Sequence, residues 1–370
     1  MTKKILFVVN VDWFFISHRL PLAIEALRRG YEVGIACGVT DKREYLESLG
    51  FKVYSLSIFR SGTSIVNELK SFVSIYNIVK RLQPDIVHFI TIKPVLYGGI
   101  ASRFVSVKTR VFSISGLGFI FIKKGLKAGV VKAIVKKLYF FAFGGKNSHV
   151  IVQNPDDKEV VKSIKNVTVT LIRGSGVDLN EYKYIEENND VVNITMACRL
   201  LKDKGVMEYA KAAKIIKEKG FNVVFYLYGD LDEGNPATLT NKELDTIKRD
   251  GFVTIEGYTT DIAAIFSNAN IIVLPSYREG LPKVLIEAAA CGRAVVTTDV
   301  PGCRDAIESN VTGLLCEVKD ASSLAKEIEK LIVDTNLRNR MGKAGRKLAE
   351  KEFDINKVVE KHFEIYEANE

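Results

Sequence analysis

The chain has 370 residues, 47% of them hydrophobic and 26% charged, which is ordinary for a soluble globular protein long enough to form two domains. No signal peptide and no uncharged apolar stretch of about 20 residues is apparent, and the five cysteines are scattered without metal-type spacing, so we expect reduced thiols in the cytoplasm. The net charge of +9 is uneven: residues 1–178 carry 27 Lys and Arg against 12 Asp and Glu. This half needs an anionic partner, which could be lipid, a polyphosphate or nucleic acid.

The first half of the chain alternates short apolar strands with helices. Strands are predicted at 5–9, 32–36, 52–56, 86–90, 111–114, 150–153 and 167–172, and helices at 20–29, 42–49 and 66–82. Gly30 and Gly50 end the first two helices. Such alternation predicts a parallel sheet that is covered on both faces.

The same pattern restarts after residue 191. Strands are predicted at 193–198, 223–228, 253–256, 271–275 and 294–298, and helices at 207–219, 239–248, 261–266, 283–291, 322–333 and 337–352. We expect an α/β protein with two doubly wound Rossmann-like domains, 1–180 and 191–352, that face each other across a cleft. The polar stretch 181–190 is the expected linker, and residues 353–370 are expected to pack back as a helix on the first domain.

The most informative local pattern is the strand, turn and helix over residues 275–288. Pro282 suits the first helical position, and Gly280 lets the backbone approach a ligand closely. The free N–H groups of this helix start form an anion site that suits a diphosphate. Glu279 in the turn and Glu287 in the helix would repel a phosphate, so sugar hydroxyls are their natural partners. The alternative is an ordinary helix entry with two solvated acids.

A second pattern supports a ligand site in the same domain. Arg199 and Lys204 follow the strand that ends at Cys198, at the carboxyl edge where open α/β sheets bind ligands. Two cations there would hold a diphosphate and stabilise it as a leaving group. The alternative is a solvated basic loop.

Taken together, these patterns resemble glycosyltransferase family 4, most closely its bacterial capsule, O-antigen and lipid-linked oligosaccharide enzymes. The resemblance spans nearly the whole chain and is carried by 11–14, 18–22, 116–119, 174–178, 199–205, 232–236, 279–287 and 300–303. It implies a GT-B fold and a retaining hexosyltransferase that uses a nucleotide sugar, with UDP the expected nucleotide.

The resemblance also implies roles for individual residues. The expected catalytic residues are Glu279, Arg199 and Lys204, with the two cations on the diphosphate and Glu279 on donor-sugar hydroxyls. The expected donor-binding residues are Glu287 (on the ribose), Gly280, Leu281, Lys283, Val284 and Tyr258 (along the base). The expected acceptor or reaction-centre residues are Asp12, His18, Arg19, Ser115 and Gly116. Many relatives have a histidine where this chain has Ser115, so only a positional role carries over there.

The mechanism is expected to be a front-face transfer, in which a phosphate oxygen of the departing nucleotide takes the acceptor proton. A double displacement with Glu279 as nucleophile is the rival. Asp230 and Asp232 have the spacing that metal-dependent glycosyltransferases use for a divalent cation. Because Arg199 and Lys204 already provide positive charge, we expect a loop-capping role for these aspartates and no metal or other cofactor.

The stretch Lys123–Phe143 mixes six lysines with a helical apolar stripe of Val131, Ile134, Val135 and Leu138. Such a helix can lie on an anionic bilayer, although a domain helix with solvated lysines has the same periodicity. The aromatic run 13–15 looks exposed, which also favours contact with a membrane. We expect a polyprenyl-diphosphate-linked glycan as acceptor, and a cytoplasmic protein bound peripherally to the inner face of the membrane.

Other functions fit the sequence less well. A nucleotide-sugar 2-epimerase shares the GT-B architecture but does not need a basic, lipid-facing half, and a transferase with a soluble acceptor is a further alternative. A nucleic-acid-binding module lacks a recognition motif, so we expect no nucleic-acid partner. A dinucleotide-dependent oxidoreductase lacks the Gly-x-Gly-x-x-Gly fingerprint after the first strand.

Overall fold

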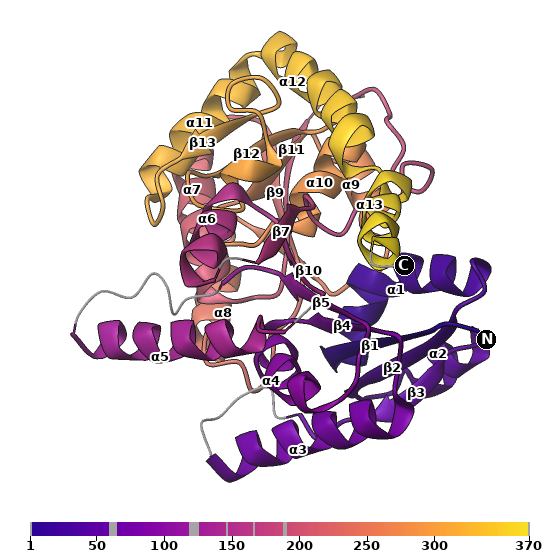
Figure 1. Cartoon of the computed structure of the whole chain (residues 1–370). Helices are drawn as coiled ribbons and strands as arrows, with labels where there is room; N and C mark the ends of the chain where they lie inside the picture. Colours follow the sequence, from indigo (N-terminus) through magenta and orange to yellow (C-terminus); the bar gives the residue numbers. More distant parts are fainter. Residues whose placement is uncertain are drawn as a thin grey trace. The chain divides into compact units, whose positions relative to one another are not determined.

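The computed structural model describes residues 2–58, 65–117, 126–145, 147–165, 167–187 and 191–368. The chain forms two compact units (Figure 1). Unit 1 contains Met1–Ser175 together with Asn356–Glu370, and unit 2 contains Gly176–Ile355. Each unit is an α/β domain built on its own parallel sheet.

Unit 1 is built on a seven-stranded sheet in the order β3-β2-β1-β4-β5-β6-β7. The strands are β1 (Lys4–Val11), β2 (Glu32–Gly38), β3 (Lys52–Ser55), β4 (Ile86–Ile90), β5 (Thr109–Ile114), β6 (Ser148–Val152) and β7 (Thr168–Leu171). The helices are α1 (Asp12–Arg28), α2 (Arg43–Ser48), α3 (Ile65–Leu82), α4 (Gly99–Ala101), α5 (Leu126–Ala142), α6 (Pro155–Ile164) and α13 (Ile355–Glu367), with a π-helical segment at Pro94–Gly98 and a 3-10 turn at Ser102–Phe104.

Alternate side chains of β1 pack against helices on opposite faces of this sheet. Leu6 and Val8 belong to a core that includes residues of α3, α5 and α6. Phe7 points the other way, with its ring 5.6 Å from that of Phe15 in α1 and 5.6 Å from that of His88. Both faces of the sheet are therefore buried, which is why its strands are continuous apolar runs.

Unit 2 has a six-stranded sheet in the order β10-β9-β8-β11-β12-β13. The strands are β8 (Val192–Ala197), β9 (Val223–Tyr228), β10 (Thr254–Gly257), β11 (Ile271–Leu274), β12 (Ala294–Thr298) and β13 (Gly313–Cys316). The helices are α7 (Val206–Glu218), α8 (Asn241–Asp250), α9 (Ile262–Asn268), α10 (Lys283–Ala290), α11 (Ala321–Val333) and α12 (Thr335–Leu348), with 3-10 turns at Lys202–Lys204 and Arg304–Ala306 and a π-helical segment at Ala349–Phe353.

Local sequence signals account for the ends of several helices. Thr240 and Glu243 form a capping box at the start of α8, and Gly251 ends that helix in the left-handed conformation with φ of 69°. Asp320 accepts hydrogen bonds from the first turn of α11, and Asn154 accepts one from Asp157 N in α6. These caps satisfy N–H groups that a helix start otherwise leaves unpaired.

The structure divides the chain at a different place from the expected linker 181–190. Tyr182 is 5% exposed within unit 2, and Glu187 forms a 2.8 Å ion pair with the buried Arg338 of α12. The stretch 181–187 therefore packs on unit 2, and the boundary between the two units lies between residues 175 and 176. Residues 188–190 lie outside the described part of the chain. The chain passes back to unit 1 at α13.

Two further expectations are corrected at the start of the chain. Helix α1 begins at Asp12 rather than at residue 20, and Pro21 lies inside it. Phe15 is fully buried against Phe7 and Phe51, so the expectation of an exposed aromatic run 13–15 is wrong for this residue. Strand β13 was missed because it is only four residues long and begins with Gly313. Among the described residues, no helix has the length and apolar character needed to span a bilayer.

Candidate active site

The carboxyl ends of two adjacent strands bring the expected donor-site residues of unit 2 together. The strand order of its sheet reverses between β8 and β11. Open α/β sheets bind ligands outside the carboxyl ends of the strands at such a switch point. Arg199 lies two residues after the end of β8, and the turn that contains Glu279 follows β11.

The two loops at this edge are held against each other by backbone contacts. Tyr277 N donates a 2.8 Å hydrogen bond to Asp203 O. Gly205 has φ of 77°, and a Cβ there would collide with the carbonyl oxygen of Pro275. Only glycine combines this left-handed conformation with such a close approach. The sequence therefore fixes the separation between the basic loop and the Glu279 turn.

Lys204 and Glu279 form an ion pair across these two loops. Lys204 Nζ contacts Glu279 Oε1, and Ser276 Oγ donates a 2.6 Å hydrogen bond to the same oxygen. The two charged side chains are only 19% and 14% exposed. Burial by itself lowers the pKa of Lys204, but the charge and hydrogen bond of Glu279 outweigh it and raise the pKa above its usual value. Lys204 therefore carries a permanent positive charge at this edge.

Arg199 pairs with the second aspartate of the Asp-x-Asp sequence. Its Nη1 lies 2.5 Å from Asp232 Oδ2, which also accepts a 3.1 Å hydrogen bond from Asn235 Nδ2. Asp232 thus joins the loop after β9 to the cation that follows β8. Among the described residues, no group of three or more His, Cys, Asp or Glu side chains is arranged to hold a metal ion.

Glu287 lies in the second turn of α10 and is 3% exposed. Its Oε1 accepts a 2.8 Å hydrogen bond from Tyr182 Oη and lies 3.1 Å from Lys283 Nζ. Burial, together with the adjacent Glu287 charge, raises the pKa of Tyr182 well above its usual value. Sequence reasoning missed Tyr182, because 105 residues separate it from its partner.

The N-terminus of α10 faces the same edge without a side-chain cap. Pro282 is the capping residue, and Lys283 and Val284 follow as the first two helical positions. Their N–H groups precede the first intrahelical donors, so this helix start can bind an anion. Leu281 is buried at 7% exposure. Glu279 N donates a 3.2 Å hydrogen bond to Pro301 O, so the loop after β12 contacts this turn.

Tyr258 lies directly after β10 and is 70% exposed. Gly257 at the end of that strand accepts a 2.8 Å hydrogen bond from Gly229 N, which links the loops after β9 and β10. An exposed aromatic side chain beside these loops can stack on a flat ring such as a nucleotide base.

In unit 1 the structure gives Asp12 a structural position. Its carboxylate is fully buried and accepts hydrogen bonds from Thr40 N at 2.6 Å, Thr40 Oγ1 at 2.7 Å and Trp13 N at 2.8 Å. Asp12 therefore begins α1 and ties the loop after β2 to it. The assignment of Asp12 to the acceptor side or the reaction centre stays a prediction.

The side chains of His18 and Arg19, both on α1, lie in different environments. The His18 ring stacks on Phe14 at 4.1 Å and is half-buried. Arg19 is 3% exposed, and desolvation lowers its pKa to about 10. Its charge is one cause of the lowered pKa of the buried imidazoles of His88 and His362. The assignment of His18 and Arg19 to the acceptor side or the reaction centre stays a prediction.

Ser115 and Gly116 follow β5 at the carboxyl edge of the unit 1 sheet. The loop is anchored at Leu117, whose N donates a 3.3 Å hydrogen bond to the buried Asp157 at the start of α6. Gly118 and Phe119, which belong to the family motif, lie outside the described residues. Ser115 thus takes a place at the strand end, as its position in the motif predicts.

The basic segment forms α5, although Lys123 and Lys124 lie outside the described residues. The expected stripe divides into two faces. Val135 and Leu138 pack against the core of unit 1, whereas Val131 and Ile134 are 47% and 54% exposed. Phe141, one helical repeat further on, is 51% exposed.

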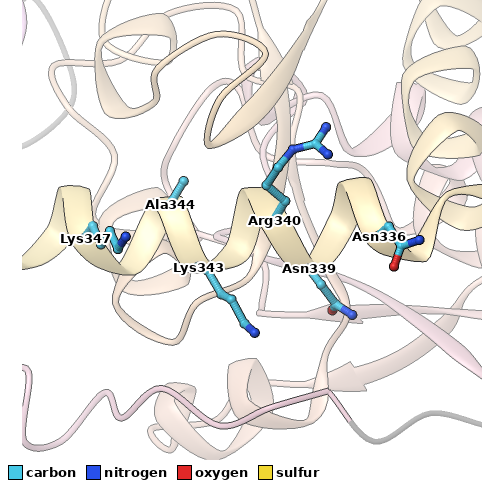
Figure 2. Close-up of a pocket in the computed structure, with 6 residues that line it drawn as sticks. All are labelled: Asn336, Asn339, Arg340, Lys343, Ala344 and Lys347. Carbon is cyan, nitrogen blue, oxygen red and sulfur yellow. The ribbon is translucent and has the colours of Figure 1, made fainter.

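A surface hollow of about 420 Å³ lies along one face of α12 in unit 2 (Figure 2). It is lined by Asn336, Asn339, Arg340, Lys343, Ala344 and Lys347. All six residues come from a single helix, and none of the strand-end residues described above contributes to it. The hollow is therefore separate from the candidate donor site.

Models of two known protein families match the chain. Residues 4–154 match the family described as "Glycosyl transferase 4-like", and residues 180–348 match "Glycosyl transferases group 1". The two matches cover most of unit 1 and most of unit 2, and the second includes the whole candidate donor site.

Individual proteins agree with this assignment. The chain is 28% identical to the N,N'-diacetylbacillosaminyl-diphospho-undecaprenol alpha-1,3-N-acetylgalactosaminyltransferase of Campylobacter jejuni, over 95% of this chain and 97% of that protein. It is 26% identical to the Escherichia coli UDP-Gal:alpha-D-GlcNAc-diphosphoundecaprenol alpha-1,3-galactosyltransferase, over 82% and 80%. An Anabaena protein solved with UDP-glucose shares the fold, with a TM-score of 0.77 and 17% identity over 99% of each chain. This chain therefore belongs to glycosyltransferase family 4 and is a glycosyltransferase with the GT-B fold.

Proposed function

We propose that this glycosyltransferase takes a hexose or N-acetylhexosamine from a UDP-sugar bound by unit 2 and transfers it, with retention of anomeric configuration, to a polyprenyl-diphosphate-linked glycan. One observation carries the donor assignment. Lys204 and Glu279 meet at the switch point of the unit 2 sheet, beside Arg199 and the uncapped start of α10. This arrangement offers cations and N–H groups to a diphosphate and a carboxylate to sugar hydroxyls.

The chemistry follows from how the charges are paired in the free protein. A bound diphosphate replaces Glu279 as a partner of Lys204 and competes with Asp232 for Arg199. Glu279 is then released to accept hydrogen bonds from the sugar. As the bond from the anomeric carbon to the phosphate oxygen breaks, Lys204, Arg199 and the α10 N–H groups stabilise the negative charge on the departing nucleotide.

The new bond forms on the face from which the nucleotide departs. The acceptor oxygen attacks the anomeric carbon, and its proton passes to the departing phosphate oxygen, so no protein base is required. The rival double displacement needs Glu279 as a nucleophile. Its Oε1 accepts a hydrogen bond from Ser276 Oγ, which lowers the nucleophilicity of that oxygen and favours front-face transfer.

The relatives support the choice of donor and acceptor. The Campylobacter and Escherichia coli enzymes are named for lipid-diphosphate-linked acceptors, the latter is named for a UDP-sugar, and the Anabaena protein binds UDP-glucose. The excess positive charge of residues 1–178 is consistent with an acceptor that carries a diphosphate.

We further propose that α5 contacts an anionic membrane surface in which such an acceptor is embedded. Its exposed apolar side chains Val131, Ile134, Phe140 and Phe141 lie on a helix that also carries Lys132, Lys136 and Lys137. Helix α3, in the same unit (Figure 1), exposes Ile65, Val66, Leu69 and Val73. Exposed apolar side chains beside lysines suit the boundary between headgroups and acyl chains.

A donor screen tests the enzymatic proposal. Nucleotide release is measured for UDP- and GDP-sugars, with and without an extracted polyprenyl-diphosphate-linked glycan. The proposal predicts release from a UDP-sugar that depends on the lipid-linked acceptor. Equal donor turnover without an acceptor would instead support a nucleotide-sugar 2-epimerase, and transfer to a soluble glycan alone would refute the acceptor assignment.

Liposome co-sedimentation tests the membrane contact. We expect the wild-type protein to sediment with anionic vesicles at low salt, and a Lys136→Glu/Lys137→Glu variant to stay largely in the supernatant. A Lys211→Glu/Lys326→Glu variant has the same charge change on α7 and α11 of unit 2 and is the matched control. Equal sedimentation of the two variants would contradict the assignment to α5.

A further inference from the structure

Glu287 is held by a hydroxyl from a segment far away in the sequence, that of Tyr182. Tyr182 Oη donates a 2.8 Å hydrogen bond to Glu287 Oε1. Both residues are buried, so water competes little for this bond. Burial, together with the charge of Glu287, raises the pKa of Tyr182, so its hydroxyl stays protonated and remains a donor.

The segment that carries Tyr182 is fastened to the elements around α10. Arg346 of α12 donates hydrogen bonds to Tyr182 O at 2.8 Å and to Ala290 O, at the end of α10, at 2.9 Å. Three residues further along the segment, Ile185 O accepts a 2.7 Å hydrogen bond from Arg293. The backbone of Tyr182 is therefore fixed relative to α10, and its hydroxyl fixes the side chain of Glu287 on that helix.

Lys283 contacts the same carboxylate but is a less constant partner. Its Nζ lies 3.1 Å from Glu287 Oε1, and its side chain is 30% exposed. Lys283 is the first residue of α10, where a bound diphosphate would attract its ammonium group. The neutral, buried hydroxyl of Tyr182 has no such alternative. The bond from Tyr182 is therefore the contact that stays in place when a diphosphate binds at this helix start.

Glu287 lies beside the part of a ligand that adjoins the diphosphate. Helical side chains lean toward the N-terminus, and the contact with Lys283 shows that Glu287 reaches the first turn of α10. In a nucleoside diphosphate the ribose is joined directly to the diphosphate, so it would lie next to this carboxylate. The hydrogen bond and the ion pair of Glu287 both use Oε1, which leaves Oε2 to accept hydrogen bonds from ribose hydroxyls.

We propose that Tyr182 is a positioning residue for ribose recognition, because its hydroxyl orients the Glu287 carboxylate so that Oε2 binds the ribose hydroxyls of the donor nucleotide. The proposal rests on the proposed function, which places a nucleoside diphosphate at the start of α10. A sugar without these hydroxyls would leave the buried carboxylate oxygen unpaired, so the same arrangement selects ribose over its deoxy analogues.

Calorimetric titration of the full-length protein with UDP and with 2′,3′-dideoxy-UDP tests this role. We expect the wild type to bind UDP about tenfold more tightly than the dideoxy analogue, and Tyr182→Phe to reduce this preference to about twofold. The affinity for the dideoxy analogue should stay within about twofold of the wild-type value, because the variant keeps the aromatic ring and its packing. Equal weakening of both nucleotides, or an unchanged preference, would show a merely structural role and overturn the proposal.

Tyr184→Phe is the matched control. Tyr184 lies two residues further along the same segment, and its ring packs against Gly292, whereas its hydroxyl makes no hydrogen bond within the described part of the chain. The control should keep the wild-type preference for UDP. A preference lowered as far as in Tyr182→Phe would contradict the assignment to Tyr182.

The same titrations with GDP and 2′,3′-dideoxy-GDP separate this role from the choice of donor. A ribose preference that depends on Tyr182 but appears with GDP alone would retain the role of Tyr182 and reject UDP. Wild-type binding of UDP without any preference for ribose would overturn the role of Tyr182 and leave the UDP-sugar proposal intact. Binding of neither nucleotide would overturn both.

Discussion

Replacement of Lys204 by methionine separates the structural contribution of this cation from its catalytic one. The change removes the partner of Glu279 while keeping most of the side-chain volume. A fully buried pair that loses one member costs about 3–5 kcal/mol. Because the two side chains remain 19% and 14% exposed and Ser276 still binds the carboxylate, we expect a loss of about 2–3 kcal/mol in the free energy of unfolding.

The double variant Lys204→Met/Glu279→Gln distinguishes the two contributions. Replacing the unpaired carboxylate by a neutral amide should recover most of the lost stability, as measured by urea denaturation. Turnover should not recover, because the preorganised positive charge that Lys204 places beside the leaving diphosphate is missing. Such a loss is worth about 10²- to 10³-fold in kcat.

The control is Lys202→Met, two residues away in the same loop. Lys202 is 48% exposed and lies 2.9 Å from Glu243, so its loss should cost less than about 1 kcal/mol and leave turnover near that of the wild type. Turnover of Lys204→Met within threefold of the wild-type value would refute the reasoning. So would a double variant no more stable than the single one.

Three more predictions follow from other parts of the molecule. Burial, with a contribution from Arg19, lowers the pKa of His362 to about 3. Between about pH 6.5 and pH 3 the unfolded chain therefore binds a proton that the folded protein does not, so the free energy of unfolding should fall as the pH drops, by up to about 1.4 kcal/mol per pH unit. His362→Gln should flatten this pH dependence, as measured by urea denaturation. Gly205→Ala should cost about 1–2 kcal/mol from its backbone alone and more from the collision with Pro275, and donor binding that survives unchanged would count against the loop geometry. Transfer activity should persist after dialysis against a chelator, and its abolition, with restoration by a divalent cation, would favour a metal role for Asp232.

The fold was largely predictable, because its signals are local. Apolar runs such as that of β11 and the turn residues between them predict strands and helices in alternation, and the two parallel sheets confirm this prediction. Because ligands of open α/β sheets bind at the carboxyl ends of the strands, the sequence predicts that Arg199, Lys204 and Glu279 lie close together. The structure shows that Lys204 and Glu279 are in contact.

The features that the sequence does not reveal are contacts between residues that are far apart in the chain. Nothing near Asp12 indicates that Thr40 occupies its oxygens, and nothing near Arg19 indicates that its side chain is buried. Tyr182 was assigned to a linker because its neighbours are polar, although its hydroxyl is bonded to the buried Glu287. Local composition describes the solvent preference of a segment, but it does not reveal which distant element covers it.

The anomeric configuration of the transferred sugar tests the central claim most directly. The full-length enzyme is incubated with the UDP-sugar that the donor screen identifies and a polyprenyl-diphosphate-linked N-acetylhexosamine. The product is then analysed by NMR spectroscopy. The proposed site and front-face mechanism predict a single new α-linkage on the lipid-linked sugar, which Lys204→Met forms far more slowly than the wild type and Lys202→Met forms at a rate near that of the wild type. A β-linkage, or an α-linked product that Lys204→Met forms as fast as the wild type, would contradict the account.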